Sequence, residues 1–285
     1  MKYFMGLTSV FLYDSSQCKM KDLKIGMILE DGSRIICMQK FKNIENLYLY
    51  NNKIYVSGNS KAVENGVTIF VKNSILSIET ECKPPFGYYL TTSTGVINIR
   101  GNVFVDYNES RNIFINKTIN SVVLNFWNNK KEESVEFAKG VAFLDNGFAG
   151  NTKLNMQDGT IKRIEDVLIG DVLENNNAVI GKAALDTYYF LFYEFCGIIV
   201  SSNTKVYDNI YWKNIECVSH AEPVDRPEKA FNLITEQSII KCKNNYFLDY
   251  TEKKDYVMCD EINKLLDIGF TTSSKNNRIL YNLPV

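Results

Sequence analysis

The residues best suited to nucleophilic, acid–base or metal chemistry are sparse in this chain. Among 285 residues there is one histidine, His220, and there are 7 cysteines. The cysteines are widely and irregularly spaced, with no Cys-x-x-Cys pair, at Cys18, Cys37, Cys82, Cys196, Cys217, Cys242 and Cys259. A zinc site needs clustered thiolates and imidazoles, so no metal site is predicted and reduced thiols are expected. Acid–base catalysis by His220 would need an orienting partner, which the sequence does not identify, so a solvated loop position is favoured.

Paired carboxylates are the second candidate for a chemically active site. The motif Asp-Tyr-x-Glu occurs at 106–109 and again at 249–252, each time after an expected strand. Two carboxylates so close in sequence could hold a cation or transfer a proton. Carboxylates at strand ends also accept hydrogen bonds from backbone amides, and this structural role is favoured. No phosphate-binding glycine loop, dinucleotide fingerprint or Ser/His/Asp set is found, so no cofactor is predicted.

These residues sit within an internal duplication. At an offset of 144, residues 8–29 align with 152–173 without a gap, and 47–61 align with 191–205. At an offset of 143, residues 90–109 align with 233–252. The three blocks keep the same order in both copies, so the chain is predicted to contain two copies of one domain.

Each copy has mostly strand-like patterning. Residues 153–164 alternate apolar and polar side chains around Asp158-Gly159, which is a hairpin signal, and 95–107 indicate two strands joined at Arg100-Gly101-Asn102. Helical patterns are confined to 134–144 and 260–268. The expected fold is therefore all-β with short helical connectors.

Residues 188–200, with the sequence YYFLFYEFCGIIV, are the most apolar stretch of the second copy. We favour one central strand buried on both faces. A surface for assembly is the alternative, because tyrosine and phenylalanine are enriched at interfaces.

Composition excludes several classes. The formal net charge is -1, which gives no electrostatic reason to expect nucleic acid or an anionic membrane as a partner. The longest apolar run, 185–200, contains Asp186 and Glu194 and is too short to span a bilayer. The N-terminal residues show no secretory cleavage pattern, and we expect an intracellular protein.

The opening block of the second copy, 147–173, resembles the start of a Hint domain, the hedgehog/intein self-processing module. The matching positions are Phe148, Thr152, Asp158, Gly159, Ile164, Asp166, Val167, Gly170 and Asp171. The first copy matches more weakly, at Phe4, Thr8, Asp14, Asp22, Leu23 and Gly26. A second family block, a strand ending in Thr-x-x-His, is similar to 54–60 and 198–204. The resemblance implies two Hint-like β domains in tandem.

The resemblance also implies which groups would act. In that family a cysteine or serine at the first position attacks the preceding carbonyl, and the histidine protonates the departing nitrogen. Here the first position holds Tyr3 and Gly147, and the histidine position holds Ser60 and Thr204. Both groups are missing from both copies, so we predict that neither copy processes itself and that there are no catalytic residues.

The expected organisation is a Hint-like repeat over 1–110, a connector with a short helix over 111–146, a second repeat over 147–253, and a C-terminal helix and tail over 254–285. The expected function is a non-catalytic structural or interaction protein with other proteins as partners, such as a minor capsid protein of a virion. One alternative is a self-cleaving enzyme with atypical groups, cut near Asn146–Gly147. Another is a small-ligand module that uses a vacated cleft near Ser57, Ser201, Thr204 and Asp249. An oligomer or larger assembly is compatible with the first of these functions.

Overall fold

A computed structural model describes residues 2–43, 45–106, 146–208 and 210–249. These residues form strands in antiparallel sheets, and their only helical elements are single 3-10 turns. The all-β prediction is therefore confirmed for the described residues. The helices expected over 134–144 and 260–268 lie outside them. None of the helical segments described is long and apolar enough to cross a membrane.

The first half, up to residue 106, holds twelve strands and two 3-10 turns. The strands are β1 (Phe4–Met5), β2 (Ser9–Phe11), β3 (Gln17–Lys19), β4 (Ile35–Lys42), β5 (Leu47–Tyr50), β6 (Ile54–Ser57), β7 (Lys61–Glu64), β8 (Val67–Phe70), β9 (Ser77–Glu79), β10 (Phe86–Thr92), β11 (Val96–Ile99) and β12 (Asn102–Val105). The turns are η1 (Met20–Asp22) and η2 (Val71–Asn73).

The second half, 146–249, follows the same plan with one extra strand and one extra 3-10 turn. Its strands are β13 (Phe148–Ala149), β14 (Lys153–Asn155), β15 (Ile161–Arg163), β16 (Val172–Leu173), β17 (Asn177–Leu185), β18 (Phe192–Phe195), β19 (Ile198–Ser201), β20 (Lys205–Tyr207), β21 (Trp212–Asn214), β22 (Glu222–Val224), β23 (Ala230–Thr235), β24 (Ile239–Cys242) and β25 (Asn245–Leu248). Its 3-10 turns are η3 (Ile164–Asp166), η4 (Thr187–Tyr189) and η5 (Ile215–Cys217).

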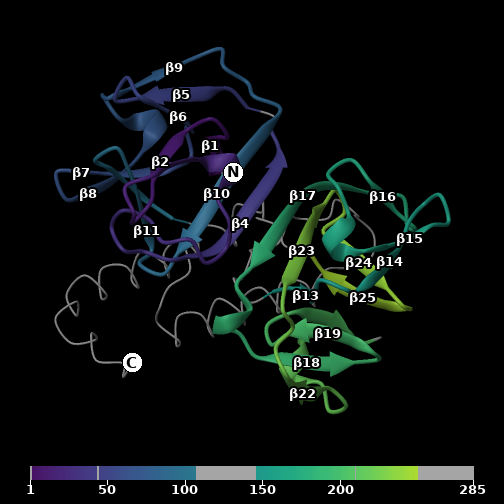
Figure 1. Cartoon of the computed structure of the whole chain (residues 1–285). Helices are drawn as coiled ribbons and strands as arrows, with labels where there is room; N and C mark the ends of the chain where they lie inside the picture. The colour runs from purple at the N-terminus through teal and green to yellow at the C-terminus, as the bar shows by residue number, and fades with distance from the viewer. Residues whose placement is uncertain (1, 44, 107–145, 209, 250–285) are drawn as a thin grey trace, which may run out of the picture.

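One sheet runs through both halves (Figure 1). Its order is β22-β18-β19-β13-β23-β17-β4-β10-β1-β6-β5-β9, with β16 added beside β17. Counted outward from the central pair β17–β4, each strand of one half occupies the same place in the order as its sequence equivalent in the other half. The four-stranded sheets β11-β12-β7-β8 and β21-β20-β25-β24 also correspond, as do the hairpins β2–β3 and β14–β15.

The two halves meet along β4 and β17, which pair antiparallel from Cys37↔Leu185 to Phe41↔Gly181. At the middle of this pairing Gln39 lies opposite Ala183. These two residues are also equivalent in the duplication, at the offset of 144 that aligns the first two blocks. A local two-fold axis therefore passes between them, and the chain has the geometry of a symmetric dimer fused into one polypeptide.

β17 suits this central position because its side chains alternate between buried and half-buried along all 9 residues. Beside the pairing, Arg34 Nε donates to Asp186 Oδ2 at 3.0 Å, and the Asp186 amide donates to the Ile36 carbonyl at 2.8 Å. Both contacts join one half to the other at the ends of the two strands. The boundary between the halves is thus stabilised by the backbone hydrogen bonds of the β4–β17 ladder, by the Arg34–Asp186 ion pair and by the packing of the side chains of β17.

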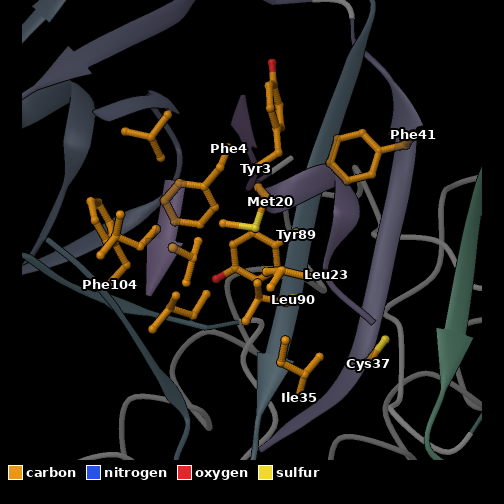
Figure 2. Packing of buried hydrophobic residues seen from close by; sticks show 14 of the residues in the cluster. Tyr3, Phe4, Met20, Leu23, Ile35, Cys37, Phe41, Tyr89, Leu90 and Phe104 are labelled. Carbon is orange, nitrogen blue, oxygen red and sulfur yellow. The ribbon is translucent and has the colours of Figure 1, made fainter. Parts of the chain in front are cut away.

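Two apolar clusters lie against these sheets. The first is built mainly from the first half but includes Ala183, Leu185, Phe192, Ala230 and Ile234 from the second. Figure 2 shows its aromatic centre, where the Phe4 ring meets Phe104 edge-on with centroids 5.1 Å apart. The second cluster repeats this contact with the equivalent rings of Phe148 and Phe247, also 5.1 Å apart. The same core contact therefore recurs in both halves.

The prediction of a single buried strand over 188–200 is wrong. This stretch forms η4 and then a hairpin, β18–β19, which turns at Cys196-Gly197 with φ of 53° and 68°. Two consecutive residues with positive φ make the tight turn that joins antiparallel strands. A Cys-Gly pair is not among the usual sequence signals of such a turn, and the apolar run on both sides concealed it. The hairpin expected around Asp158-Gly159 and the strand pair around Arg100-Gly101 are both present.

A substitution at the boundary tests how tightly the halves pack. A Cβ at Gly181 would lie 2.8 Å from Ile234 Cδ1 and 2.9 Å from Phe41 Cβ. Gly181→Val should therefore lower the free energy of unfolding by about 1–3 kcal/mol through overpacking. Ala184→Val is the matched control, because Ala184 is half-buried and lines an open groove. Urea unfolding followed by circular dichroism measures both; equal losses would contradict the tight packing at Gly181.

Candidate functional site

The predicted site residues come together at two equivalent places, which we call the first and second junctions. The first junction contains Tyr3, Ser57 and Ser60, and the second contains Gly147, Ser201 and Thr204. In each junction the start of the first core strand, β1 or β13, is held against the end of β6 or β19. The strand ends position the hydroxyl groups, and the short turn after each strand brings the second hydroxyl back to the first.

At the second junction the Gly147 amide donates to Ser201 Oγ at 2.8 Å and to Thr204 Oγ1 at 3.1 Å. The Ser201 amide in turn donates to the Gly147 carbonyl at 2.8 Å. Ser201 and Thr204 are fully buried, with their hydroxyl oxygens 3.2 Å apart. The peptide nitrogen of Gly147 is thus satisfied by two hydroxyl groups away from water.

The first junction repeats this arrangement. The Tyr3 amide donates to Ser57 Oγ at 3.1 Å, the Ser57 amide donates to the Tyr3 carbonyl at 2.8 Å, and Ser60 Oγ lies 2.9 Å from Ser57 Oγ. Ser57 and Ser201 thus bind the backbone of a residue 54 positions away, which joins elements that are distant in the chain.

The side chains at the first position of each junction are not placed for nucleophilic attack. The Tyr3 hydroxyl donates to Oδ1 of the buried Asn43 at 2.5 Å (Figure 2 shows the ring beside Phe41). Burial, with the Glu45 charge adding to it, raises the pKa of Tyr3 above its ordinary value, which disfavours the phenolate. Gly147 has no side chain, and Leu185 Cδ1 occupies the space that a Cβ there would take.

Two asparagines also lie at the second junction, of which the sequence analysis named Asn146 only as part of the alternative cleavage point and did not name Asn232. Asn146 is buried, and its carbonyl accepts from Asn232 Nδ2 at 2.8 Å. The Asn146 Nδ2 donates to the Asp249 carbonyl at 3.1 Å, whereas its Oδ1 is buried without a partner. The equivalents of Asn146 and Asn232 in the first half are Lys2 and Tyr89. The Asn-Gly dipeptide at the boundary between the connector and the second repeat was the available signal for Asn146.

The two Asp-Tyr-x-Glu motifs use their aspartates as predicted for backbone capping. Asp106 Oδ2 accepts from the Thr92 amide at 2.8 Å and from Thr92 Oγ1 at 3.0 Å. Asp249 Oδ2 accepts from the Thr235 amide and hydroxyl at 2.5 and 2.7 Å. The remaining residues of the motifs, 107–109 and 250–252, lie outside the described residues. Within the described part of the chain no group of three or more His, Cys, Asp or Glu residues is arranged to hold a metal ion.

His220 is exposed on a turn, and its ring lies 5.0 Å from the ring of Phe195. This agrees with the solvated loop position expected for it. The six described cysteines are all free thiols. Burial raises the pKa of Cys242 to about 11, so this thiol is poorly reactive as well as inaccessible.

The residues considered for a small-ligand cleft lie in the interior of the protein. Ser57, Ser201, Thr204 and Asp249 are buried and bonded to neighbouring chain segments. A groove of roughly 260 Å³ lies elsewhere, at the boundary between the halves, and is lined by Lys21, Leu23, Met38, Gln39, Lys40, Tyr88, Val167, Leu168, Ile169, Lys182, Ala184 and Phe231. There the ammonium group of Lys182 donates to the Glu165 carbonyl at 2.6 Å and lies over the Phe231 ring.

Comparison with known proteins adds no identification. No protein-family model matches the chain, and no curated protein matches it significantly. The function of the chain therefore has to be inferred from its own residues, and above all from the geometry of the two junctions.

The hydroxyl groups of the second junction should be coupled in their contribution to stability. Ser201→Ala or Thr204→Val alone leaves the Gly147 amide one acceptor, and each should cost about 1 kcal/mol. The double variant leaves that amide buried without an acceptor, so its loss should exceed the sum of the single losses by about 1–3 kcal/mol. Urea unfolding of the wild type, the two single variants and the double variant gives the four free energies that this comparison needs. Ser219→Ala, at an exposed site, is the control, and strict additivity would contradict the shared amide.

The cysteines should differ in reactivity in the folded protein. Cys196 and Cys217 are exposed, whereas Cys37 and Cys242 are buried. Iodoacetamide at a pH of about 8, near the ordinary pKa of a cysteine thiol, should label the exposed pair first and reach the buried pair only after unfolding. Peptide mass spectrometry reads each site separately. Rapid native labelling of Cys242 would contradict its position in the second core.

Proposed function

We propose that this chain is a non-catalytic structural and interaction protein, built from two Hint-like domains that have lost their self-processing groups. The specific role proposed is that of a structural component of a virion, such as a minor capsid protein. Its partners are other proteins, and an assembly of several chains is its working form. The Hint assignment comes from the sequence resemblance, and the virion role comes from the kinds of organism and virus in which that family occurs.

The observation that carries the loss of processing is the packing at the two junctions. Self-processing needs a thiol or hydroxyl beside the carbonyl that it attacks. At the second junction Leu185 stands where a side chain of residue 147 would be. At the first junction the only oxygen on the corresponding side chain is hydrogen-bonded to the buried Asn43. Both junction amides are bound by uncharged serine and threonine hydroxyls, which are much weaker acids than an imidazolium ion.

The continuous sheet supports a structural role. Two domains joined by a flexible linker move independently, but here the ladder between β4 and β17 spans five residue pairs and is flanked by shared core residues. A rigid double domain of this kind presents surfaces at fixed distances and angles. That property suits an assembly component.

One observation favours the self-cleaving alternative. The side-chain Nδ2 of Asn232 donates to the carbonyl of Asn146, which is where negative charge would develop if the Asn146–Gly147 bond were attacked. The side-chain nitrogen of Asn146 is the nucleophile nearest in the chain. Attack on its own carbonyl would form a cyclic imide and release the Gly147 amine, with the proton passing from the carboxamide to that amine.

Intact mass spectrometry separates the two functions. The structural role predicts one species at 32.7 kDa after prolonged incubation, with or without thiol or hydroxylamine. Cleavage at residue 147 would refute that role. Two fragments whose masses add up to the intact mass would identify imide formation by Asn146, whereas a sum larger by one water would identify hydrolysis. Asn146→Ala is the matched variant, since it removes the only side chain able to form the imide.

A second measurement tests the assembly itself. Cross-linking in the source cells or particles, followed by density-gradient separation, should place the uncut chain in a complex with other proteins. Migration as a free monomer in every fraction would contradict the proposed role.

A further inference from the structure

The two ends of the long sheet differ in a way that the duplication does not explain. The sheet ends at β9 in the first half and at the equivalent strand β22 in the second. Around β22 the sequence is EPVDRPE, with two prolines and four charged residues, which is how proteins block strand addition at an edge. Around β9 it is ILSIETE, with three aliphatic residues and no proline. The edge at β22 is protected, whereas no strand among the described residues pairs with the outer side of β9.

The open edge exposes apolar surface. Ile75, Leu76 and Ile78 have 96%, 42% and 61% of their surface exposed. Ile78 pairs with Leu49 across β5–β9, so its side chain continues an apolar row that stops at the edge. Exposed aliphatic side chains on an unpaired edge strand are typical of a surface that is covered by another strand.

The hydrogen bonds of β9 define which backbone groups are available. The Thr80 amide donates to the Leu47 carbonyl at 3.0 Å, and the Asn51 amide donates to the Leu76 carbonyl at 2.8 Å. Residues 76, 78 and 80 therefore direct their backbone groups toward β5. Since these groups alternate in direction along an antiparallel strand, Ser77 and Glu79 direct theirs to the open edge. Among these outward groups, the Ser77 amide already donates to a described backbone group, the Ser74 carbonyl, at 3.3 Å.

We propose that β9 pairs antiparallel with β9 of a second copy of this chain, around a two-fold axis at Ile78. In this register Ser77 of each copy faces Glu79 of the other, and their outward backbone groups form a ladder of four hydrogen bonds. In two of these bonds the Ser77 amide exchanges its 3.3 Å contact with Ser74 for one with Glu79 of the other copy. Ile78 faces its own counterpart at a non-hydrogen-bonded position, where side chains approach most closely. The contact is isologous and closes as a dimer, and it deepens the proposed structural function on which it rests.

Charge favours a second copy in this orientation. Glu79 and Glu81 both follow Ile78 in the strand. Antiparallel pairing about Ile78 sets Glu79 against Ser77 and Glu81 against Ile75, so no two carboxylates lie opposite each other. Parallel pairing would set Glu79 against Glu79, and like charges directly opposite are destabilising. The edge is thus self-complementary in backbone direction, apolar surface and charge.

Sedimentation velocity of the full chain tests the pairing. With concentration rising from about a micromolar to about a millimolar, the mass should shift from 32.7 kDa toward twice that value. Ile78→Lys should keep the chain monomeric, because two ammonium groups would face each other at the axis. Since Ile78 is largely exposed, the melting temperature of the Ile78→Lys variant should stay close to that of the wild type. Ile161→Lys, at 63% exposure on β15, is the matched control and should dimerise like the wild type.

A mixing experiment makes the test specific for the axis. Ile78→Lys and Ile78→Glu should each be monomeric alone and should dimerise when mixed, because opposite charges then face each other. A wild type that stays monomeric throughout, including one whose own chain covers β9, would overturn the inference. So would a dimer unaffected by Ile78→Lys, or a mixture that fails to associate. An uncut chain that is found in a complex with other proteins, but is monomeric when pure, would overturn only this inference and leave the proposed function standing.

Discussion

The antiparallel pairing of β4 with β17 is the interaction on which the rest of the structure depends. It turns two similar β units into one sheet, and it places the local two-fold axis between Gln39 and Ala183. Because the strands are hydrogen-bonded neighbours, residues from the second half complete the first core, as Ala183 and Ile234 do. Without this ladder each half would expose a long central strand whose backbone groups lack partners, which is unfavourable and prone to aggregation.

A dimer fused into one chain is free to become asymmetric. In a true homodimer every substitution appears on both sides of the axis, whereas after fusion each copy changes alone. The two halves here share the contacts that hold the fold, including the junction hydroxyls, the aspartates that bind Thr92 and Thr235, and the edge-on aromatic pairs. They differ where the fold does not require identity. The second junction carries Asn146 and Asn232, and only one end of the sheet is rich in proline and charge.

The two junctions keep one hydrogen-bonding arrangement although their residues differ. Ser57 and Ser201 bind the backbone at the start of the first core strand, which fixes how that strand enters the sheet. That task needs a small buried acceptor and nothing acidic or nucleophilic. Serine and threonine meet it, because a hydroxyl oxygen can accept from an amide within a closely packed core. The framework common to both junctions therefore reflects stability, and the proposed loss of processing is compatible with an intact fold.

The sequence by itself determined the duplication, the all-β class and several turns. These are local or repeated properties: alternation along a strand, positive-φ residues such as Gly159, and self-similarity at a fixed offset. The sequence also indicated that Tyr3, Ser60, Gly147 and Thr204 occupy equivalent positions. It did not reveal the hairpin at Cys196-Gly197, because apolar residues on both sides of a turn resemble one continuous buried strand. Only the tertiary structure decided that β4 pairs with β17, that Asn232 reaches Asn146, and that β9 ends the sheet. Each of these depends on contacts between residues far apart in the chain, which pattern and propensity do not encode.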